Sequence, residues 1–257
     1  DWDADWETAA TVDDGVWYTE SFIPWTVASM KSQSGEIRKI KMAFYRMMMG
    51  IGKGVSTIKG SPFENLYLSV FNQYEVKNYS GAKLDFFPYV TVNQDMSRSD
   101  LLSKAGAEVF WKIDSSKQVN LTLNPDFGQV ESDEVVVNFS AFETFYSDRR
   151  PFFAENNNLF DVSDYMHRII NTRRIGGRPD YDCSLYGELE EYCRQNKSET
   201  SEIDFALKYT QKGEIDFGFM SASERDEKFS KGRDFYALRL NTKSDNLQYG
   251  YLGTYVD

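Results

Sequence analysis

The residues best suited to chemistry gather in a polar stretch between residues 124 and 155. Its carboxylates Asp126, Glu131, Asp133 and Glu134 carry the oxygen ligands that a hard cation such as calcium takes. Their spacing does not fit the EF-hand calcium loop with its central glycine. Glu131 and Asp133 could instead do the acid–base work of a glycosidase, which depends on a separation in space that the sequence hides.

Arginines lie in and after the same stretch, at Arg149, Arg150, Arg173, Arg174 and Arg178. Because buried charges are tolerated only when they are neutralised, we favour an ion-pair network in a protein interior over a metal site. A plug or gate built from such a network would be functional without catalysis. The predicted network comprises Asp126, Glu131, Asp133, Glu134, Arg149, Arg150, Glu155, Arg173 and Arg174.

His167 is the sole histidine, so a Ser-His-Asp or Cys-His arrangement would have to use it. No G-x-S-x-G nucleophile turn accompanies it, and the glycines at 50, 52 and 54 precede no helix that would make them a nucleotide site. We assign no catalytic residue, and we expect neither a cofactor nor a bound metal.

Tryptophans concentrate near the N-terminus, where Trp17 and Trp25 are eight positions apart. On one unbroken strand they would share a face and could stack on sugar rings. Alternatively, these tryptophans fill the core of a small sandwich.

Cys183 and Cys193 bound a polar stretch, CSLYGELEEYC. A disulfide between them would fit an oxidising compartment, and two free thiols remain the alternative.

The composition narrows the class of partner. With 29 basic and 40 acidic residues the net charge is -11, which argues against a nucleic-acid partner. Aromatic residues make up 16%, which suits either interfacial girdles or an aromatic-rich sandwich. No apolar stretch reaches the roughly 20 residues of a membrane helix.

Strict alternation of apolar and polar residues begins beyond residue 80 and predicts strands with one apolar and one polar face. Periodicity leaves open whether the apolar face meets lipid or a packed core. The short polar turns at 211–213 and 243–246 favour lipid. The seven alternating segments lie at 84–92, 105–113, 119–123, 203–209, 215–219, 236–240 and 247–255.

Three motifs carry a family resemblance: NPDFGQVESDEVVVN (124–138), FETFYSDRRPFFAE (142–155) and TRRIGG (172–177). The chain resembles a large bacterial family that joins a family-9-like carbohydrate-binding domain to an outer-membrane β-barrel of unknown function. Residues 3–25 look like the closing part of the sandwich, and residues 205–222 look like an early barrel hairpin.

The resemblance implies an all-β protein: the C-terminal part of a β-sandwich (1–77), then the N-terminal strands of an antiparallel outer-membrane β-barrel (78–257) with a lumenal, plug-like insert (124–178). We expect the rest of both domains to lie outside this sequence. The expected location is the Gram-negative outer membrane, with the first domain periplasmic. The expected partners are outer-membrane lipid and a saccharide.

Three functions follow from these expectations. The favoured one is binding or passage of a solute or saccharide through a charged lumen. The second is a membrane-associated hydrolase whose active site is the acidic, arginine-rich insert. The third is a soluble all-β carbohydrate-binding module.

Overall fold

The computed structural model describes residues 6–60, 67–79, 81–95, 100–126, 148–162, 169–198, 200–243 and 247–257. The chain divides into two compact units, one of Asp1–Ser32 with Gly81–Asp257 and one of Gln33–Ser80. Both are built from antiparallel strands, with only short helices between them. The all-β prediction is confirmed.

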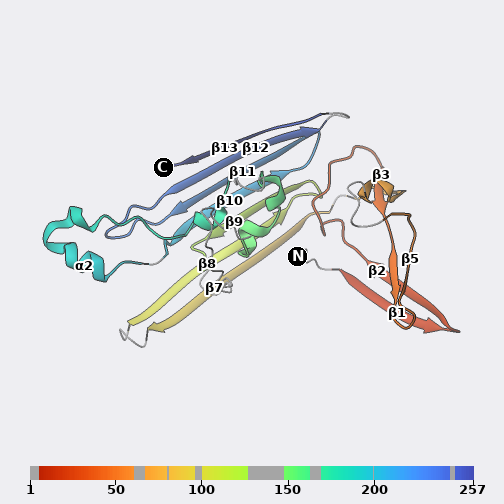
Figure 1. Cartoon of the computed structure of the whole chain (residues 1–257), viewed down its shortest axis with the longest axis horizontal. Coiled ribbons are helices and arrows are strands. Elements are labelled where there is room, and N and C mark those ends of the chain that lie inside the picture. Colours follow the sequence, from red (N-terminus) through yellow and green to blue (C-terminus); the bar gives the residue numbers. More distant parts are fainter. Residues whose placement is uncertain are drawn as a thin grey trace. The chain divides into compact units, whose positions relative to one another are not determined.

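The main element of the larger unit is a seven-stranded antiparallel sheet (Figure 1). Each strand pairs with its neighbours in sequence, in the order β13-β12-β11-β10-β9-β8-β7. Each of the seven alternating segments of the sequence forms or overlaps one of these strands. Pro88 lies in β7 at one side of the sheet, where its missing N–H is tolerated. The strands are β7 (Lys83–Asp95), β8 (Asp100–Lys112), β9 (Lys117–Leu123), β10 (Ile203–Gln211), β11 (Ile215–Glu224), β12 (Asp234–Lys243) and β13 (Gln248–Val256).

The register of the sheet separates the two kinds of side chain. Val109 of β8 lies opposite Leu121 of β9, which lies opposite Leu207 of β10. Because directly paired residues of antiparallel strands point to the same face, apolar rows run from strand to strand. Asn120 of β9 and Lys208 of β10 are paired on the other face. We call these the apolar face and the polar face of the sheet.

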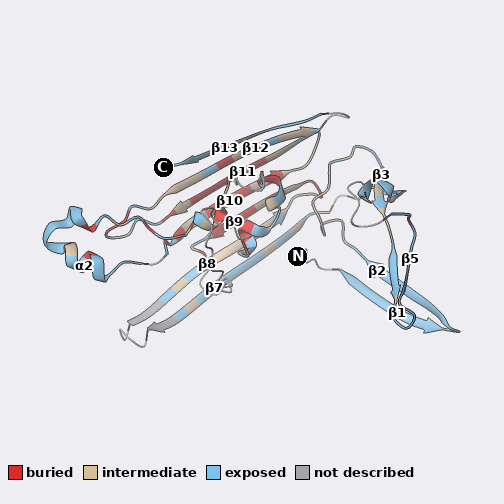
Figure 2. Ribbon diagram, in the orientation of Figure 1, coloured by how far each residue is buried: buried red, intermediate tan, exposed pale blue. Residues whose placement is uncertain are grey.

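Burial is the reverse of what a soluble sheet shows. The large apolar side chains of the apolar face are exposed or only partly covered, whereas Asn120, Thr122 and Lys208 of the polar face are buried. Figure 2 shows the buried positions concentrated on β9, β10 and β11. The polar face is covered by the segment between β9 and β10 (residues 124–202), which we call the insert from here on.

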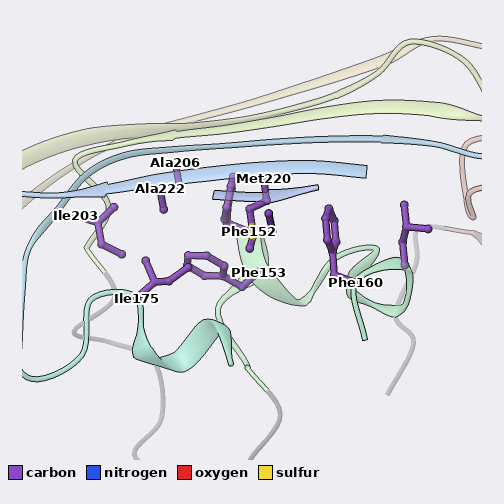
Figure 3. Close-up of a cluster of buried hydrophobic side chains, with 10 residues drawn as sticks. Phe152, Phe153, Phe160, Ile175, Ile203, Ala206, Met220 and Ala222 are labelled. Atoms are coloured by element: carbon purple, nitrogen blue, oxygen red, sulfur yellow. The ribbon is translucent and has the colours of Figure 1, made fainter. Parts of the chain in front are cut away.

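The insert contributes short helices and its own aromatic core. Pro151 begins α1, where its fixed φ suits a first helical turn. Phe152 and Phe160 point from the insert towards the sheet (Figure 3), and each is at most 1% exposed. Burying such a side chain stabilises by about 1.5–3 kcal/mol. The elements are α1 (Pro151–Ala154), η2 (Asn157–Leu159), η3 (Thr172–Arg174), η4 (Cys183–Leu189) and α2 (Glu190–Gln195).

Small residues of the polar face make room for this core. Ala206, Ala222 and Ala237 of three adjacent strands are buried in one cluster with the insert's phenylalanines. Gly218 leaves no room for a side chain, because a Cβ built there would lie 2.7 Å from Cζ of Phe160. The sheet surface is therefore shaped to receive the insert.

A β-hairpin precedes the sheet in the sequence. It consists of β1 (Glu7–Asp13) and β2 (Val16–Phe22), whose residues are all exposed. Asp14 and Gly15 form the turn with φ of 47° and 74°. Two positive φ angles are typical of the tight turn that matches hairpin twist, and Asp-Gly is among its preferred pairs.

The smaller unit contains two further strand pairs, β3 (Ile37–Met42) with β6 (Asn72–Lys77) and β4 (Tyr45–Met48) with β5 (Lys53–Ser56). The sequence predicts one strand over 37–49 and another over 66–76, and both predictions are wrong in part. The first breaks after Met42 because its halves pair with different strands. The second begins as the 3₁₀ helix η1 (Tyr67–Val70).

Candidate functional site on the polar face

The candidate site is the set of polar side chains held between the polar face and the insert. Alternate positions of β9 place Gln118, Asn120 and Thr122 on this face, and all three are buried. Lys208 and Thr210 of β10 are paired with Asn120 and Gln118 and are buried as well. Buried polar groups are unfavourable unless they are hydrogen-bonded, so their partners define what the site does.

Lys208 binds the C-terminal end of α1. Its ammonium donates hydrogen bonds to the carbonyl oxygen of Phe152, to that of Glu155 at 2.6 Å and, at 3.4 Å, to that of Phe153. The last carbonyls of a helix lack partners within the helix, so the cation satisfies them and stabilises the negative end of its dipole. Lys208 therefore joins strand β10 to the insert.

A chain of amide groups extends from Lys208 along β9. Gln118 Nε2 donates to Asn120 Oδ1 at 2.7 Å, and Asn120 Nδ2 donates to Glu155 Oε2 at 3.2 Å. Asn156 Nδ2 donates to Gln118 Oε1 at 2.9 Å. The ammonium of Lys112 lies 3.4 Å from Glu155 Oε1. Glu155, a member of the predicted network, thus contacts strands β8 and β9.

A second ion pair holds the insert together. Arg150 Nε and a terminal guanidinium nitrogen donate to the two carboxylate oxygens of Asp148 at 2.9 and 2.6 Å. The same guanidinium donates at 2.7 Å to the carbonyl oxygens of Thr172 and Ile175 and lies 4.2 Å from the ring centre of Phe153. Such bidentate pairs fix geometry as well as charge. This pair ties residues 148–155 to residues 172–175.

Glu224 and Arg233 form a third buried contact between strand and insert. Gly176 N donates to Glu224 Oε1 at 2.8 Å, and Arg233 Nε donates to Glu224 Oε2 at 2.9 Å. The hydrogen bond to Glu224 raises the pKa of Arg233 above its ordinary value. The Glu224 side chain is 1% exposed, so this pair is part of the interior.

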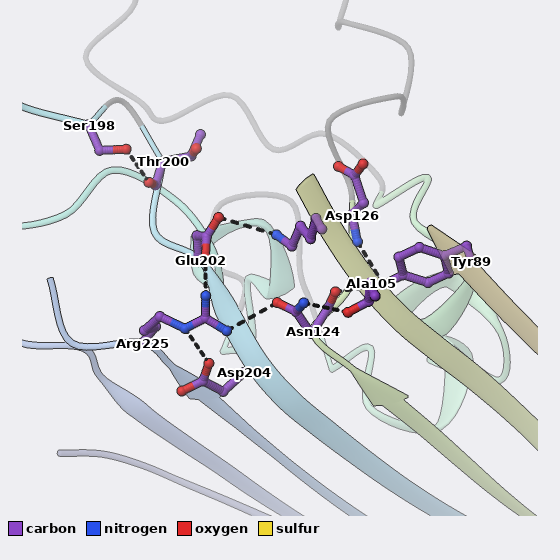
Figure 4. Close-up of polar contacts among 10 residues, drawn as sticks. Tyr89, Ala105, Asn124, Asp126, Ser198, Thr200, Glu202, Asp204 and Arg225 are labelled. Atoms are coloured by element: carbon purple, nitrogen blue, oxygen red, sulfur yellow. Dashed lines mark hydrogen bonds and ion pairs between the residues drawn. The ribbon is translucent and has the colours of Figure 1, made fainter. Parts of the chain in front are cut away.

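A more open cluster lies where β10 begins and β11 ends (Figure 4). Arg225 donates to Asp204 at 2.6 Å, to Glu202 at 2.5 Å and to Asn124 Oδ1 at 3.1 Å. Lys104 lies 3.4 Å from Glu202. These side chains are nearly half exposed for the most part, which makes the cluster a charged rim.

Tyr89 connects this rim to the predicted acidic stretch. Its hydroxyl donates to the Asn124 carbonyl oxygen at 2.7 Å and accepts from the backbone N–H of Asp126 at 2.9 Å. Asn124 Nδ2 donates to the Ala105 carbonyl oxygen at 2.6 Å. Asp126 is held here through its backbone.

The members of the predicted network that the structure describes lie in different surroundings. Arg150 and Glu155 both lie in the site, but Arg150 pairs with Asp148, which the prediction omitted. Arg149 and Arg174 are exposed and Arg173 is half-buried. Glu131, Asp133, Glu134 and His167 lie outside the described residues.

Sequence reasoning missed the residues that join strand to insert. Alternation of apolar and polar residues places Lys208, Gln118 and Asn120 on a polar face, but it does not show that they contact the insert. It also does not single out Glu224 and Arg233. A lysine and two amides at alternate strand positions, opposite an apolar face, are a signal for a covered polar surface.

The tryptophan prediction depends on a strand that is shorter than expected. Trp17 lies on β2 and is 44% exposed, but β2 ends at Phe22, before Trp25. The two rings therefore do not share one unbroken strand, and the argument that places them on a common face does not hold.

Cys183 and Cys193 form a disulfide with a Cα–Cα distance of 5.6 Å. Both cysteines pack with Phe229 in a small cluster, and the ring of Tyr186 meets Phe229 edge-on at 5.0 Å.

In the part of the chain that the structure describes, no three Asp, Glu, His or Cys residues gather as a metal site. No helix in these described ranges is long and apolar enough to cross a membrane.

The fold and site define an all-β protein whose antiparallel sheet carries a polar insert on one face. A family described as a domain of unknown function (DUF5916) matches residues 80–242. This match covers more than half of the chain, including β7 to β11, the insert and nearly all of β12, so the chain belongs to this family. No curated protein and no solved structure matches the chain. The carbohydrate-binding-like part of the prediction lies outside the matched residues.

Proposed function

We propose that residues 78–257 form part of the wall of a bacterial outer-membrane β-barrel. The apolar face of the sheet contacts lipid, the polar face lines the lumen, and the insert is a plug within that lumen. The protein binds or passes a solute or saccharide through this charged interior. The N-terminal region is a periplasmic, carbohydrate-binding-like domain.

The exposed apolar face carries this proposal. Leu84, Phe86 and Val90 of β7 are between 60% and 74% exposed. Aromatic side chains of β12 and β13, including Tyr236 and Tyr255, continue the same face. A soluble protein rarely leaves a contiguous apolar patch larger than a few hundred Å² in water. Alternating apolar-out and polar-in positions are the pattern of a transmembrane barrel strand.

The covered polar face supports a plugged lumen. Lys208 and Glu155 hold the insert on this face by charge-assisted hydrogen bonds, and the Asp148–Arg150 pair holds the insert itself together. The disulfide between Cys183 and Cys193 suits the oxidising periplasm and cell surface. If the apolar face contacts lipid, charged residues can lie only on the opposite face, and the buried charges of this sheet lie on the polar face.

Membrane fractionation of native cells tests this function. We expect the protein to fractionate with outer membranes and to show heat-modifiable gel mobility. The Val90→Arg variant should lose outer-membrane assembly, because arginine at the middle of a bilayer costs about 2–4 kcal/mol in a barrel strand. Val12→Arg is the matched control, since Val12 is also an exposed strand valine but lies in β1. A protein found free in the periplasm, or equal assembly of both variants, would reject the proposal.

A further inference from the structure

A small surface pocket lies beside the disulfide loop, apart from the polar-face site. It has a volume of about 340 Å³ and is lined by Arg178, Pro179, Asp180, Tyr181 and Lys197. Ligand pockets are commonly of about 300–1,000 Å³, so this one accommodates one or two sugar rings.

The walls of the pocket are fixed by hydrogen bonds. The Tyr181 hydroxyl donates to Glu227 at 2.5 Å and accepts from Ser198 N at 3.0 Å. Ser230 Oγ donates to the carbonyl oxygen of Asp180 at 3.2 Å. Pro179 is buried, and the disulfide begins two residues beyond Tyr181. The aromatic ring therefore has a set position.

The pocket carries two cations in a chain of net charge -11. Among the residues that the structure describes, neither Arg178 nor Lys197 forms an ion pair. The Lys197 ammonium lies 5.8 Å from the ring centre of Tyr181. The one acidic side chain in the lining, Asp180, lies 3.7 Å from a nitrogen of Arg233. The pocket thus presents two exposed cations beside an aromatic ring.

We propose that this pocket binds an acidic saccharide, with the carboxylate of a uronic acid between Arg178 and Lys197 and the sugar ring against Tyr181. A guanidinium matches a carboxylate by paired hydrogen bonds. The partly exposed ring of Tyr181 gives the C–H face of a pyranose an apolar surface, which a simple anion does not use. This inference rests on the saccharide-binding part of the proposed function and names the class of saccharide.

The test is calorimetric titration of the purified protein with trigalacturonic acid and with its fully methyl-esterified form, which has the same sugar rings but no charge. We expect binding of the acid and at least a tenfold weaker interaction with the ester. Arg178→Gln and Lys197→Gln should each weaken binding of the acid about tenfold, the size expected for one lost charged hydrogen bond. Lys243→Gln, which removes a lysine at the far end of β12, should leave affinity unchanged.

Two results would overturn the proposal. One is equal binding of the acid and the ester, or an affinity unaffected by both pocket variants. The other is competition by inorganic phosphate as strong as that of the trisaccharide, which would make the pocket a site for small anions. Outer-membrane fractionation of Arg178→Gln separates the two proposals, because loss of saccharide binding there leaves membrane assembly intact.

Discussion

The two faces of the seven-stranded sheet differ in a way opposite to ordinary globular proteins. Leu84, Phe86 and Val90 on the apolar face are exposed, whereas Asn120 and Lys208 on the polar face are almost fully buried. Alternating apolar and polar side chains are compatible with burial of either face. The buried face is the one that the rest of the protein packs against, and here the insert packs against the polar face.

The polar face tolerates burial because its lysine and amide groups have partners. Lys208 caps α1, Asn120 and Gln118 bond to Glu155 and Asn156, and aromatic side chains fill the space between. The apolar face needs no such partners if its neighbour is a hydrocarbon layer. The contrast between the faces is thus the physical basis for assigning one to a lumen and the other to lipid.

Truncating an aromatic side chain on each face should give the largest difference. Phe152→Ala removes a fully buried ring of the insert and should lower the free energy of unfolding by about 3–5 kcal/mol. Phe86→Ala, on the apolar face and 60% exposed, leaves no cavity within the protein and should lower it by less, by about 1.5–3 kcal/mol, the cost of losing a ring from its lipid surroundings. Denaturant titration of both variants under the same conditions measures the difference. Equal effects would mean that the two faces are buried alike.

The smallest effect is expected at glycine positions on the two faces. Gly218→Ala should lower the free energy of unfolding by about 1–3 kcal/mol. The new methyl group would lie within 3 Å of the Phe160 ring and of the Leu159 side chain. Gly253→Ala, on the apolar face, meets the hydroxyl end of Tyr251, an exposed side chain that can move aside. Thermal unfolding of both variants compares them, and a greater loss at Gly253 would contradict the assignment of faces.

The strands and the sides of their residues could be predicted from period-two alternation, and the seven segments of the sequence matched β7 to β13. The cover could not be predicted, because periodicity records that a face is polar but not what lies on it. Lys208 reaches carbonyl groups more than 50 residues earlier in the chain. No local pattern signals such a contact.

Local breaks were also beyond the sequence pattern. The apolar run at 37–49 reads as one strand, yet β3 and β4 pair with different partners, so the strand divides after Met42. The partner of Arg150 is Asp148, two residues away, while the prediction looked to carboxylates further upstream. Competing short-range partners of similar chemistry can be separated only by geometry.

Quenching of Trp111 fluorescence by brominated phospholipid tests the account most directly. Trp111 lies on the apolar face of β8, and Phe110 beside it lies on the polar face. The measurement uses protein reconstituted from outer membranes, with every tryptophan except Trp111 replaced by phenylalanine. It compares this protein with one that also carries Trp111→Phe and Phe110→Trp. The account predicts strong quenching for the first protein and little for the second, whereas equal quenching, or quenching of the second alone, would contradict it.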